Sequence, residues 1–140
     1  MHRNSEGYAD PTAGAAMQRI LYQQYIERQK KRNAYKNRKK IYVASRYAGS
    51  IEANVQAAIR YCRRVIEAGY MLIASHLLYP QMLDDSNFEE REMGLMFGLA
   101  LLRMCDEVWV FGEISRGMAE EIKEAKERKK TLRYFREETT

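Results

Sequence analysis

Short runs of β-branched and aromatic residues alternate with longer amphipathic segments over the last hundred residues of the chain. The runs at 41–45, 70–74, 106–112 and 131–135 have the composition of strands, and the segments between them repeat apolar residues at helical spacing. Strands that alternate with helices through short loops form parallel sheets with right-handed crossovers. The pattern therefore predicts an α/β fold, a flavodoxin-like or Rossmann-like three-layer sandwich around a four- or five-stranded parallel sheet.

Start and stop signals place three helices between these strands. The first is expected to begin after Ser50 and to stop at Gly69. The second follows Ser86-Asn87-Phe88-Glu89, which has the spacing of a capping box, and continues to about Met104. The third is capped by Ser115 and continues to about Arg128. The buried stripe of the first helix is expected to consist of Ile51, Val55, Ile59, Cys62 and Ile66.

The second helix is apolar on every face between residues 93 and 102. This stretch is too short to cross a bilayer, so one side must pack on the sheet and the other side on something else. We expect that second cover to be another copy of the chain, in a homo-oligomer. Gly94 and Gly98, four residues apart, allow a close helix approach. The methionines at 82, 93, 96, 104 and 118 are expected to fill the core.

Residues 1–39 are predicted to form a basic helical extension, separate from an α/β domain at 40–140. Asp10-Pro11 is a typical helix start. An apolar stripe with Met17, Leu21 and Tyr25 fades into basic and amide residues after Glu27. Residues 1–40 hold ten Lys and Arg against three acidic residues, in a chain of net charge +5, so the basic signal belongs to the extension. We expect an arm for packing or oligomerisation; nucleic-acid contact, through this extension only, is the alternative.

Length and composition exclude several other classes of protein. A chain of 140 residues with 46% apolar and 31% charged residues is typical of one globular domain with an appendage. No apolar run is long enough for a membrane span, and no secretion signal opens the sequence. Cys62 and Cys105 are too few for a disulfide framework or a zinc site, and neither is expected to be a nucleophile. We therefore predict a cytoplasmic protein without metal or membrane contact.

Polar residues at the carboxyl ends of two predicted strands indicate a ligand site. In open parallel sheets, ligands bind beyond the carboxyl ends of the strands, where the strand order reverses. If the strand at 41–45 lies between the strands at 70–74 and 106–112, the loops 45–49 and 112–117 meet at the point where the strand order reverses. The second loop leads into a helix start, whose free N–H groups favour an anionic or polar ligand. Glu113 lies in that loop and Glu121 about two turns into the helix.

Three segments at these positions resemble the nucleoside 2-deoxyribosyltransferase family. They are Ile41-Tyr42-Val43-Ala44-Ser45-Arg46-Tyr47, Asp106-Glu107-Val108-Trp109-Val110-Phe111-Gly112 and Ser115-Arg116-Gly117-Met118-Ala119-Glu120-Glu121. The resemblance covers residues 40–135 and is strongest to small members from bacterial and phage genomes. It implies that Glu121 is the catalytic nucleophile and that Tyr42 positions it. Arg46 stands where the family has Pro, and Ser115 where it has Asp.

The resemblance implies transfer or hydrolysis of a ribosyl or deoxyribosyl group on a nucleoside or nucleotide. A carboxylate nucleophile and an acid for the leaving base are sufficient for this chemistry, so no cofactor is expected. The acid is sought among Asp84, Asp85 and Glu90. The residues expected to bind the substrate are Ser45, Arg46, Tyr47, His76, Asp84, Asp85, Gly112, Glu113, Ser115, Gly117 and Met118.

The sequence also allows simpler interpretations. Glu121 on pattern alone is a solvated charge, His76 a hydrogen-bonding loop residue, and Arg46 and Arg116 surface cations instead of phosphate ligands. Tyr47 either packs or stacks on a base. Two alternative functions remain: a nucleotide-binding module without turnover, and an interaction protein of a phage or mobile element. Helix phase predicts that Glu121 lies at the edge of the buried side within reach of Tyr42, with Glu120 and Glu124 toward solvent.

Overall fold

The computed structural model describes residues 11–136, which divide into two compact units between Asn37 and Arg38. The first unit contains α1 (Pro11–Lys36), a single helix of 26 residues. None of its described side chains, from Thr12 to Lys36, is buried. The proposed cap residue Asp10 lies outside the described residues. The second unit contains all the strands and the other helices, and it is described separately below.

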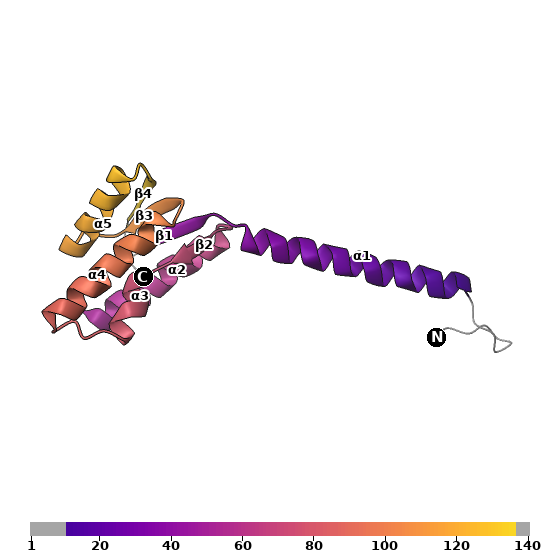
Figure 1. Ribbon diagram of the computed structural model, residues 1–140, viewed down its shortest axis with the longest axis horizontal. Coiled ribbons are helices and arrows are strands. Elements are labelled where there is room, and N and C mark those ends of the chain that lie inside the picture. The colour runs from indigo at the N-terminus through magenta and orange to yellow at the C-terminus, as the bar shows by residue number, and fades with distance from the viewer. Residues whose placement is uncertain (1–10, 137–140) are drawn as a thin grey trace. The chain divides into compact units, whose positions relative to one another are not determined.

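A four-stranded parallel sheet organises the second unit (Figure 1). Its strands are β1 (Lys40–Ala44), β2 (Met71–Ile73), β3 (Glu107–Phe111) and β4 (Thr131–Phe135), in the order β2-β1-β3-β4. Tyr42 of β1 is in register with Ile73 of β2 and with Val108 of β3. The predicted parallel α/β fold is therefore confirmed, with β1 between β2 and β3 as the ligand-site argument required.

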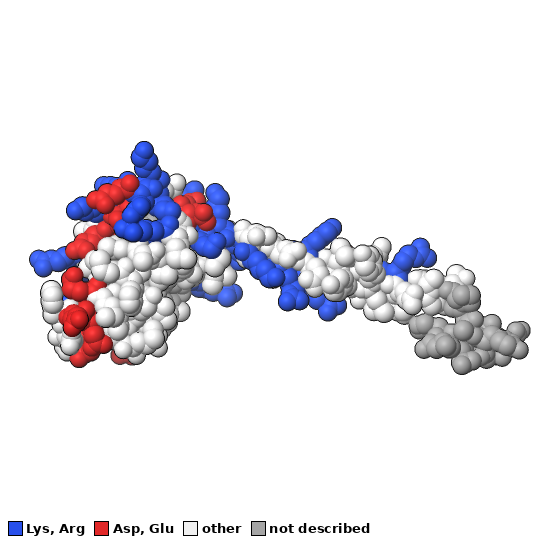
Figure 2. Space-filling model, in the orientation of Figure 1, with Lys and Arg blue, Asp and Glu red and all other residues white. Residues whose placement is uncertain are grey.

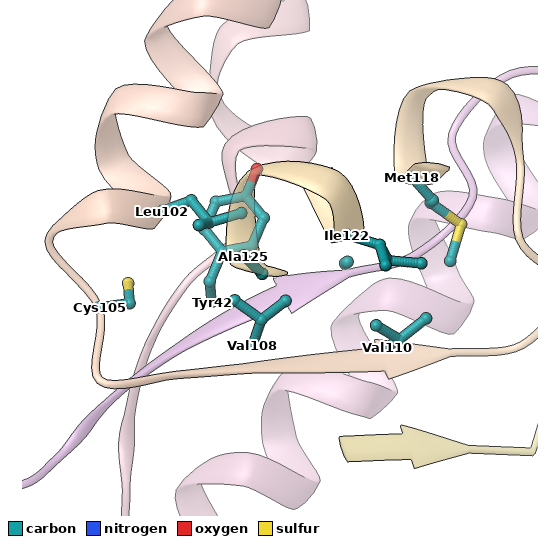
Figure 3. Close-up of a cluster of buried hydrophobic side chains, with 9 residues drawn as sticks. Tyr42, Leu102, Cys105, Val108, Val110, Met118, Ile122 and Ala125 are labelled. Atoms are coloured by element: carbon teal, nitrogen blue, oxygen red, sulfur yellow. The ribbon is translucent and has the colours of Figure 1, made fainter. Parts of the chain in front are cut away.

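Helices cover both faces of the sheet because the strand side chains alternate. Ile41 and Val43 point to the face covered by α2 (Ile51–Glu67), where they pack with Trp109 and Phe111. Tyr42 and Ala44 point to the other face, which is covered by α4 (Phe88–Arg103) and α5 (Arg116–Glu127). Figure 3 shows this second cluster, in which Tyr42 lies with Val108, Leu102 and Ala125.

Capping and turn residues explain most of the helix boundaries. Ser115 caps α5 by accepting a hydrogen bond from the Met118 N–H at 3.3 Å. Gly69, with φ of +98°, follows α2 in the left-handed conformation that glycine adopts easily. The start of α4 differs from the prediction. Its cap is Asn87, whose side chain accepts from the Glu90 N–H, and not Ser86, because the Ser86 hydroxyl bonds to Asp84 instead.

Two short helical turns follow β2 that the sequence pattern did not predict. They are α3 (Ser75–Leu78) and the 3₁₀ turn η1 (Tyr79–Gln81). A segment of seven residues is too short to show helical periodicity, and Pro80 suggested a loop. These turns bring residues 75–79 to the carboxyl edge of the sheet, beside the candidate site.

The prediction of the buried face of α2 was wrong. Of the expected stripe only Cys62 is buried, and Ile51, Ile59 and Ile66 are exposed. The helix instead turns Tyr61 inward, where its ring stacks on Phe111 with 4.5 Å between centroids. An aromatic ring buries more area than an aliphatic side chain, so it sets the rotation of the helix. The residues of α2 that are buried are Ala58, Tyr61, Cys62 and Val65.

The expectation that the methionines fill the core was also wrong for four of the five. Met118 is fully buried, whereas Met82, Met93, Met96 and Met104 are all at least 40% exposed. For Met93 and Met96 the reason is that only one side of α4, with Gly98 and Leu102, faces the sheet, whereas Met82 and Met104 lie outside this helix. Both cysteines are buried and unpaired, and burial raises the pKa of each thiol to about 11.

Leu102 tests the packing of α4 on the sheet. It is fully buried among Tyr42, Val108 and Ile122, so Leu102→Ala leaves a cavity there. We expect the free energy of unfolding to fall by about 2–5 kcal/mol in urea denaturation. Met104→Ala, at a position 68% exposed, is the control and should cost less than about 1 kcal/mol. Equal losses in the two variants would contradict this packing.

Candidate active site

A cleft of about 570 Å³ opens at the carboxyl edge of the sheet, on the side of α4 and α5. Each of the first three strands contributes to it through the segment that follows the strand. The first half of α4 forms the remaining wall. The principal lining residues are Ser45 and Tyr47 after β1, Ser75, His76 and Tyr79 after β2, Asp85, Glu90, Arg91 and Glu92 near the start of α4, and Ser115, Arg116, Gly117, Met118, Glu120 and Glu121 after β3.

Glu121 enters the cleft from the second turn of α5. The Ser115 cap fixes where this helix begins, and the buried side chains of Met118 and Ile122 fix its rotation. Glu121 therefore lies at the boundary between the core and the cleft. Its Oε2 atom is buried and, among the described residues, has no hydrogen-bond partner.

The other two carboxylates of the interior are both paired. Glu107 accepts hydrogen bonds from Arg133 at 2.9 Å and from Trp109 at 3.1 Å. Glu124 accepts from Arg103 at 2.7 Å. The prediction that Glu124 points to solvent was wrong, because this arginine draws it against α4. An unpaired oxygen on a buried carboxyl group is costly, so the site of Glu121 calls for a functional explanation.

The Tyr42 side chain lies next to the carboxyl group of Glu121. Its ring is buried in the core, and its hydroxyl group forms a hydrogen bond of 2.6 Å with Ser75 Oγ and lies close enough to Glu121 to lower the pKa of that carboxyl group. An ionised carboxylate only accepts, so Tyr42 donates to Glu121 and Ser75 donates to Tyr42. Burial raises the pKa of Tyr42 well above its ordinary value, so the phenol keeps its proton. Ser75, Tyr42 and Glu121 thus lie in one row from the segment after β2 to α5.

Burial also changes the acidity of Glu121 itself. Desolvation raises the pKa of its carboxyl group to about 7, although the hydrogen bond from Tyr42 acts in the opposite direction. The ordinary pKa of a glutamate is 4.5 on the same scale. Both protonation states of Glu121 are therefore populated at neutral pH, as is common for residues that exchange protons or attack a substrate.

His76 and Ser45 form a second polar pair in the cleft. The Ser45 Oγ and His76 Nε2 atoms are 2.8 Å apart, and both side chains lie largely inside the protein. Burial lowers the pKa of His76 to about 4, so the imidazole is neutral at pH 7. His76 therefore lies against the Ser45 hydroxyl as a neutral ring on the wall of the cleft.

The cleft brings together most of the residues proposed from the sequence. Glu121 and seven of the eleven proposed substrate-binding residues line it. Those that line it are Ser45, Tyr47, His76, Asp85, Ser115, Gly117, Met118 and Glu121. Tyr42 is buried beside Glu121 and does not itself line the cleft.

Four proposed residues lie elsewhere. Arg46, Gly112 and Glu113 line a separate cavity of about 50 Å³ on the side of α2, and there Arg46 forms an ion pair with Glu113 at 3.5 Å. The loops after β1 and β3 thus border both faces of the sheet, and these three residues belong to the face away from Glu121. Asp84 is exposed outside the cleft, and hydrogen bonds from Ser86 lower the pKa of its carboxyl group.

Sequence reasoning missed Ser75, Tyr79, Arg91 and Glu92. Ser75 follows β2 at the same sheet edge as Ser45, so the rule for parallel sheets was sufficient to propose it. Arg91 and Glu92 gave no signal of their own, because Glu90 was the only residue at the start of α4 that was considered for chemistry.

Comparison with known proteins places the chain in a family. The model of a family described as "Domain of unknown function (DUF7768)" matches residues 39–135. The chain belongs to this family. No curated protein matches the chain. Among the described residues, no three potential ligands cluster as a metal site, and no helix is both long and apolar enough to cross a membrane.

One solved structure relates the fold of this DUF7768 domain to a known enzyme. It is a 2-deoxyribosyltransferase from the psychrotolerant bacterium Bacillus psychrosaccharolyticus, described as a biocatalyst for the synthesis of antiviral and antitumoral nucleosides. The TM-score is 0.58 at 17% sequence identity, over 69% of this chain and 72% of that chain. The likeness establishes a distant relationship of fold, in agreement with the three sequence segments that resemble this family.

Gly98 provides a test of the hydrogen-bond chain beneath the cleft. A Cβ atom at Gly98 would lie 2.9 Å from Ser75 Oγ and 3.3 Å from the Tyr42 hydroxyl, so Gly98→Ala forces these groups apart. We expect it to lower the free energy of unfolding by about 1–3 kcal/mol. Gly94→Ala is the matched control, since its Cβ would meet only the flexible end of Leu83, at 3.3 Å. The better helix propensity of alanine should leave that variant neutral or stabilised, in urea denaturation. Stabilisation by both substitutions would contradict the close approach at Gly98.

The buried carboxyl group gives stability a definite pH dependence. Because the folded-state pKa of Glu121 is raised to about 7, the folded protein retains this proton better than the unfolded chain. The resulting stability is fully present below pH 4.5 and is lost as the pH rises through 7. Glu121→Gln should therefore stabilise the protein by up to about 3 kcal/mol at pH 8.5 and by much less at pH 5, in urea denaturation.

Glu127→Gln, at an exposed position of the same helix, is the control for this measurement. It should change the stability little at either pH. A gain from Glu121→Gln that is the same at pH 5 and pH 8.5 would show that the carboxyl group is not desolvated.

Proposed function

We propose that this protein breaks N-glycosidic bonds of nucleosides or nucleotides, with Glu121 as the nucleophile. The observation that carries the proposal is the unpaired Oε2 atom of Glu121. This carboxyl group lines the cleft, is oriented by Tyr42, and keeps one oxygen uncommitted, although the other interior carboxylates are paired with arginines. The distant fold relationship to a 2-deoxyribosyltransferase supports the same reaction class.

The first step is a displacement at the anomeric carbon. Oε2 of ionised Glu121 attacks C1′, the C1′–N bond breaks, and its electron pair leaves with the base. The products are the free base and a glycosyl ester on Glu121. Tyr42 fixes the rotamer of the attacking carboxylate through its hydrogen bond, which lowers the entropic cost of the attack.

The leaving base needs a proton as the C1′–N bond breaks. Asp85 and Glu90 line the cleft and are the candidates for this acid, whereas Asp84 lies outside it. His76 is neutral and does not fill this role. In the second step, water or another base attacks C1′, the ester bond breaks, and the carboxylate of Glu121 is restored. The proton lost by the incoming nucleophile returns to the same acid.

The surroundings of the cleft suggest how a nucleoside is held. We propose that Tyr47 and Tyr79 offer faces for a base, and that Ser45 and Ser115 offer hydroxyl groups to the sugar. Arg91 and Arg116 line the same cleft and would receive a 5′-phosphate if the substrate is a nucleotide.

Self-association and location complete the proposal. We propose that a second copy of the chain covers the outer side of α4, where Phe88, Met93, Met96 and Phe97 are exposed. The two unpaired cysteines are consistent with a reducing cytoplasm.

Release of free base tests the proposed reaction. The purified protein should release free base from at least one member of a panel of ribo- and deoxyribonucleosides and their 5′-monophosphates. Chromatography measures the base released. Because the nucleophile must be ionised, kcat/KM should rise with pH through about 7, the pKa of Glu121 in the free protein. Glu121→Gln should lower the rate at least about a thousandfold, whereas Glu127→Gln, outside the cleft, should leave it unchanged.

The same panel decides between catalysis and binding alone. Retained turnover in Glu121→Gln would refute the nucleophile. Saturable binding of a nucleotide without base release in the unaltered protein would favour the alternative, a binding module. The observation that favours this alternative is Ser115. It stands where the nucleoside 2-deoxyribosyltransferase family has Asp, and its hydroxyl group caps α5.

A further inference from the structure

The strongest feature outside the cleft is the exposed, basic helix α1. Between Pro11 and Lys36 it has six Lys and Arg and a single acidic residue, Glu27. Figure 2 shows the basic side chains that project along this helix. None of the described side chains of α1 is buried, and a helix with no packed face gains little stability from its own sequence. The composition therefore indicates a partner for α1.

The basic residues near the end of α1 share one face. Arg28, Arg32 and Lys36 are four residues apart, so their side chains follow one line along the helix. Tyr35 lies beside this line and is 59% exposed, and Tyr25 is 54% exposed and precedes Arg28 by three residues. The basic face, defined as Tyr25, Arg28, Arg32, Tyr35 and Lys36, thus combines cations with aromatic rings.

The charges of the basic face are not balanced within the helix. No Asp or Glu lies three or four residues from Arg28, Arg32 or Lys36, whereas Glu27 lies at such spacings from Lys30 and Lys31. Like charges four residues apart destabilise a helix by a few tenths of a kcal/mol per pair. A polyanion that binds this face removes that repulsion.

The next two basic residues after α1, Arg38 and Lys39, form contacts within the α/β unit. The Arg38 guanidinium donates to the carbonyl groups of Ile66 and Tyr70, at 3.5 Å each. Lys39 lies 4.0 Å from the buried Glu107. The cations of this basic run that remain for a partner are therefore concentrated on α1.

We propose that the basic face of α1 binds the phosphate backbone of a nucleic acid. Arg28, Arg32 and Lys36 extend over about 12 Å of helix, and a duplex presents a phosphate charge about every 1.7 Å along its axis. Tyr25 and Tyr35 on the same face add rings that stack on unpaired bases. A membrane surface fits less well, because Met17, Leu21 and Tyr25 continue the same line as the cations, while interfacial helices separate apolar and charged faces.

Binding of labelled oligonucleotides to the full chain tests the proposal. The probes are a fluorescein-labelled 20-base-pair DNA duplex, its single strand, and an RNA strand of the same sequence, measured by fluorescence anisotropy from 50 to 200 mM salt. We expect saturable binding to at least one probe, and affinity that falls steeply as salt rises. The three probes distinguish a duplex backbone from a single strand.

Two double variants separate the basic face from total charge. Arg28→Gln/Arg32→Gln removes two cations from the basic face. Arg19→Gln/Lys30→Gln removes two cations from the opposite face of the helix, where these residues share one line because they are eleven residues apart. The first should weaken binding about tenfold or more and lower the salt slope by about two, while the second should weaken binding less than about threefold. Glutamine preserves helix propensity, and circular dichroism checks that both variants fold.

Three results would overturn the proposal. The first is the absence of binding to all three probes at 50 mM salt. The second is an equal loss in the two double variants, which would show an effect of net charge without a defined face. The third is binding of α1 to vesicles of anionic lipid with no binding to oligonucleotides.

Discussion

The desolvated carboxyl group of Glu121 is the constraint around which the α4 and α5 side of the sheet is organised. A charge in such a place costs stability, and no cation of residues 11–136 offsets it as arginines do for Glu107 and Glu124. The hydroxyl groups of Tyr42 and Ser75 reduce the cost, and they fit because Gly98 has no side chain. Packing of the core and the geometry of the site are thus the same set of contacts.

The parallel sheet supplies the positions of this site. Because all four strands point the same way, the segments after β1, β2 and β3 meet at one edge and place Ser45, Ser75 and Ser115 around one cleft. Strand alternation then assigns the two faces different roles. Tyr42 reaches the face with Glu121, and the loop residue Arg46 joins Glu113 on the face of α2.

Much of this could be predicted from residue patterns. The order of strands and helices, the parallel sheet, and the convergence of Ser45, Ser115 and Glu121 follow from periodicity, caps and strand ends. The pairing of Tyr42 with Glu121 came from a family resemblance, since nothing local to Glu121 distinguishes it from Glu120. The turns at 75–81 were not predictable, because seven residues carry no helical period and their conformation depends on packing against α4.

The sequence by itself determined the alternation of elements, the cap of α5 and the separate basic charge of α1, because propensity, capping and charge act between neighbours in the chain. Tertiary structure alone decided the rotation of α2, which Tyr61 sets by stacking on Phe111, and the exposure of most methionines. It also decided that Glu121 is desolvated while Glu124 is paired. Burial and stacking depend on groups brought together from distant parts of the chain, so local patterns do not report them.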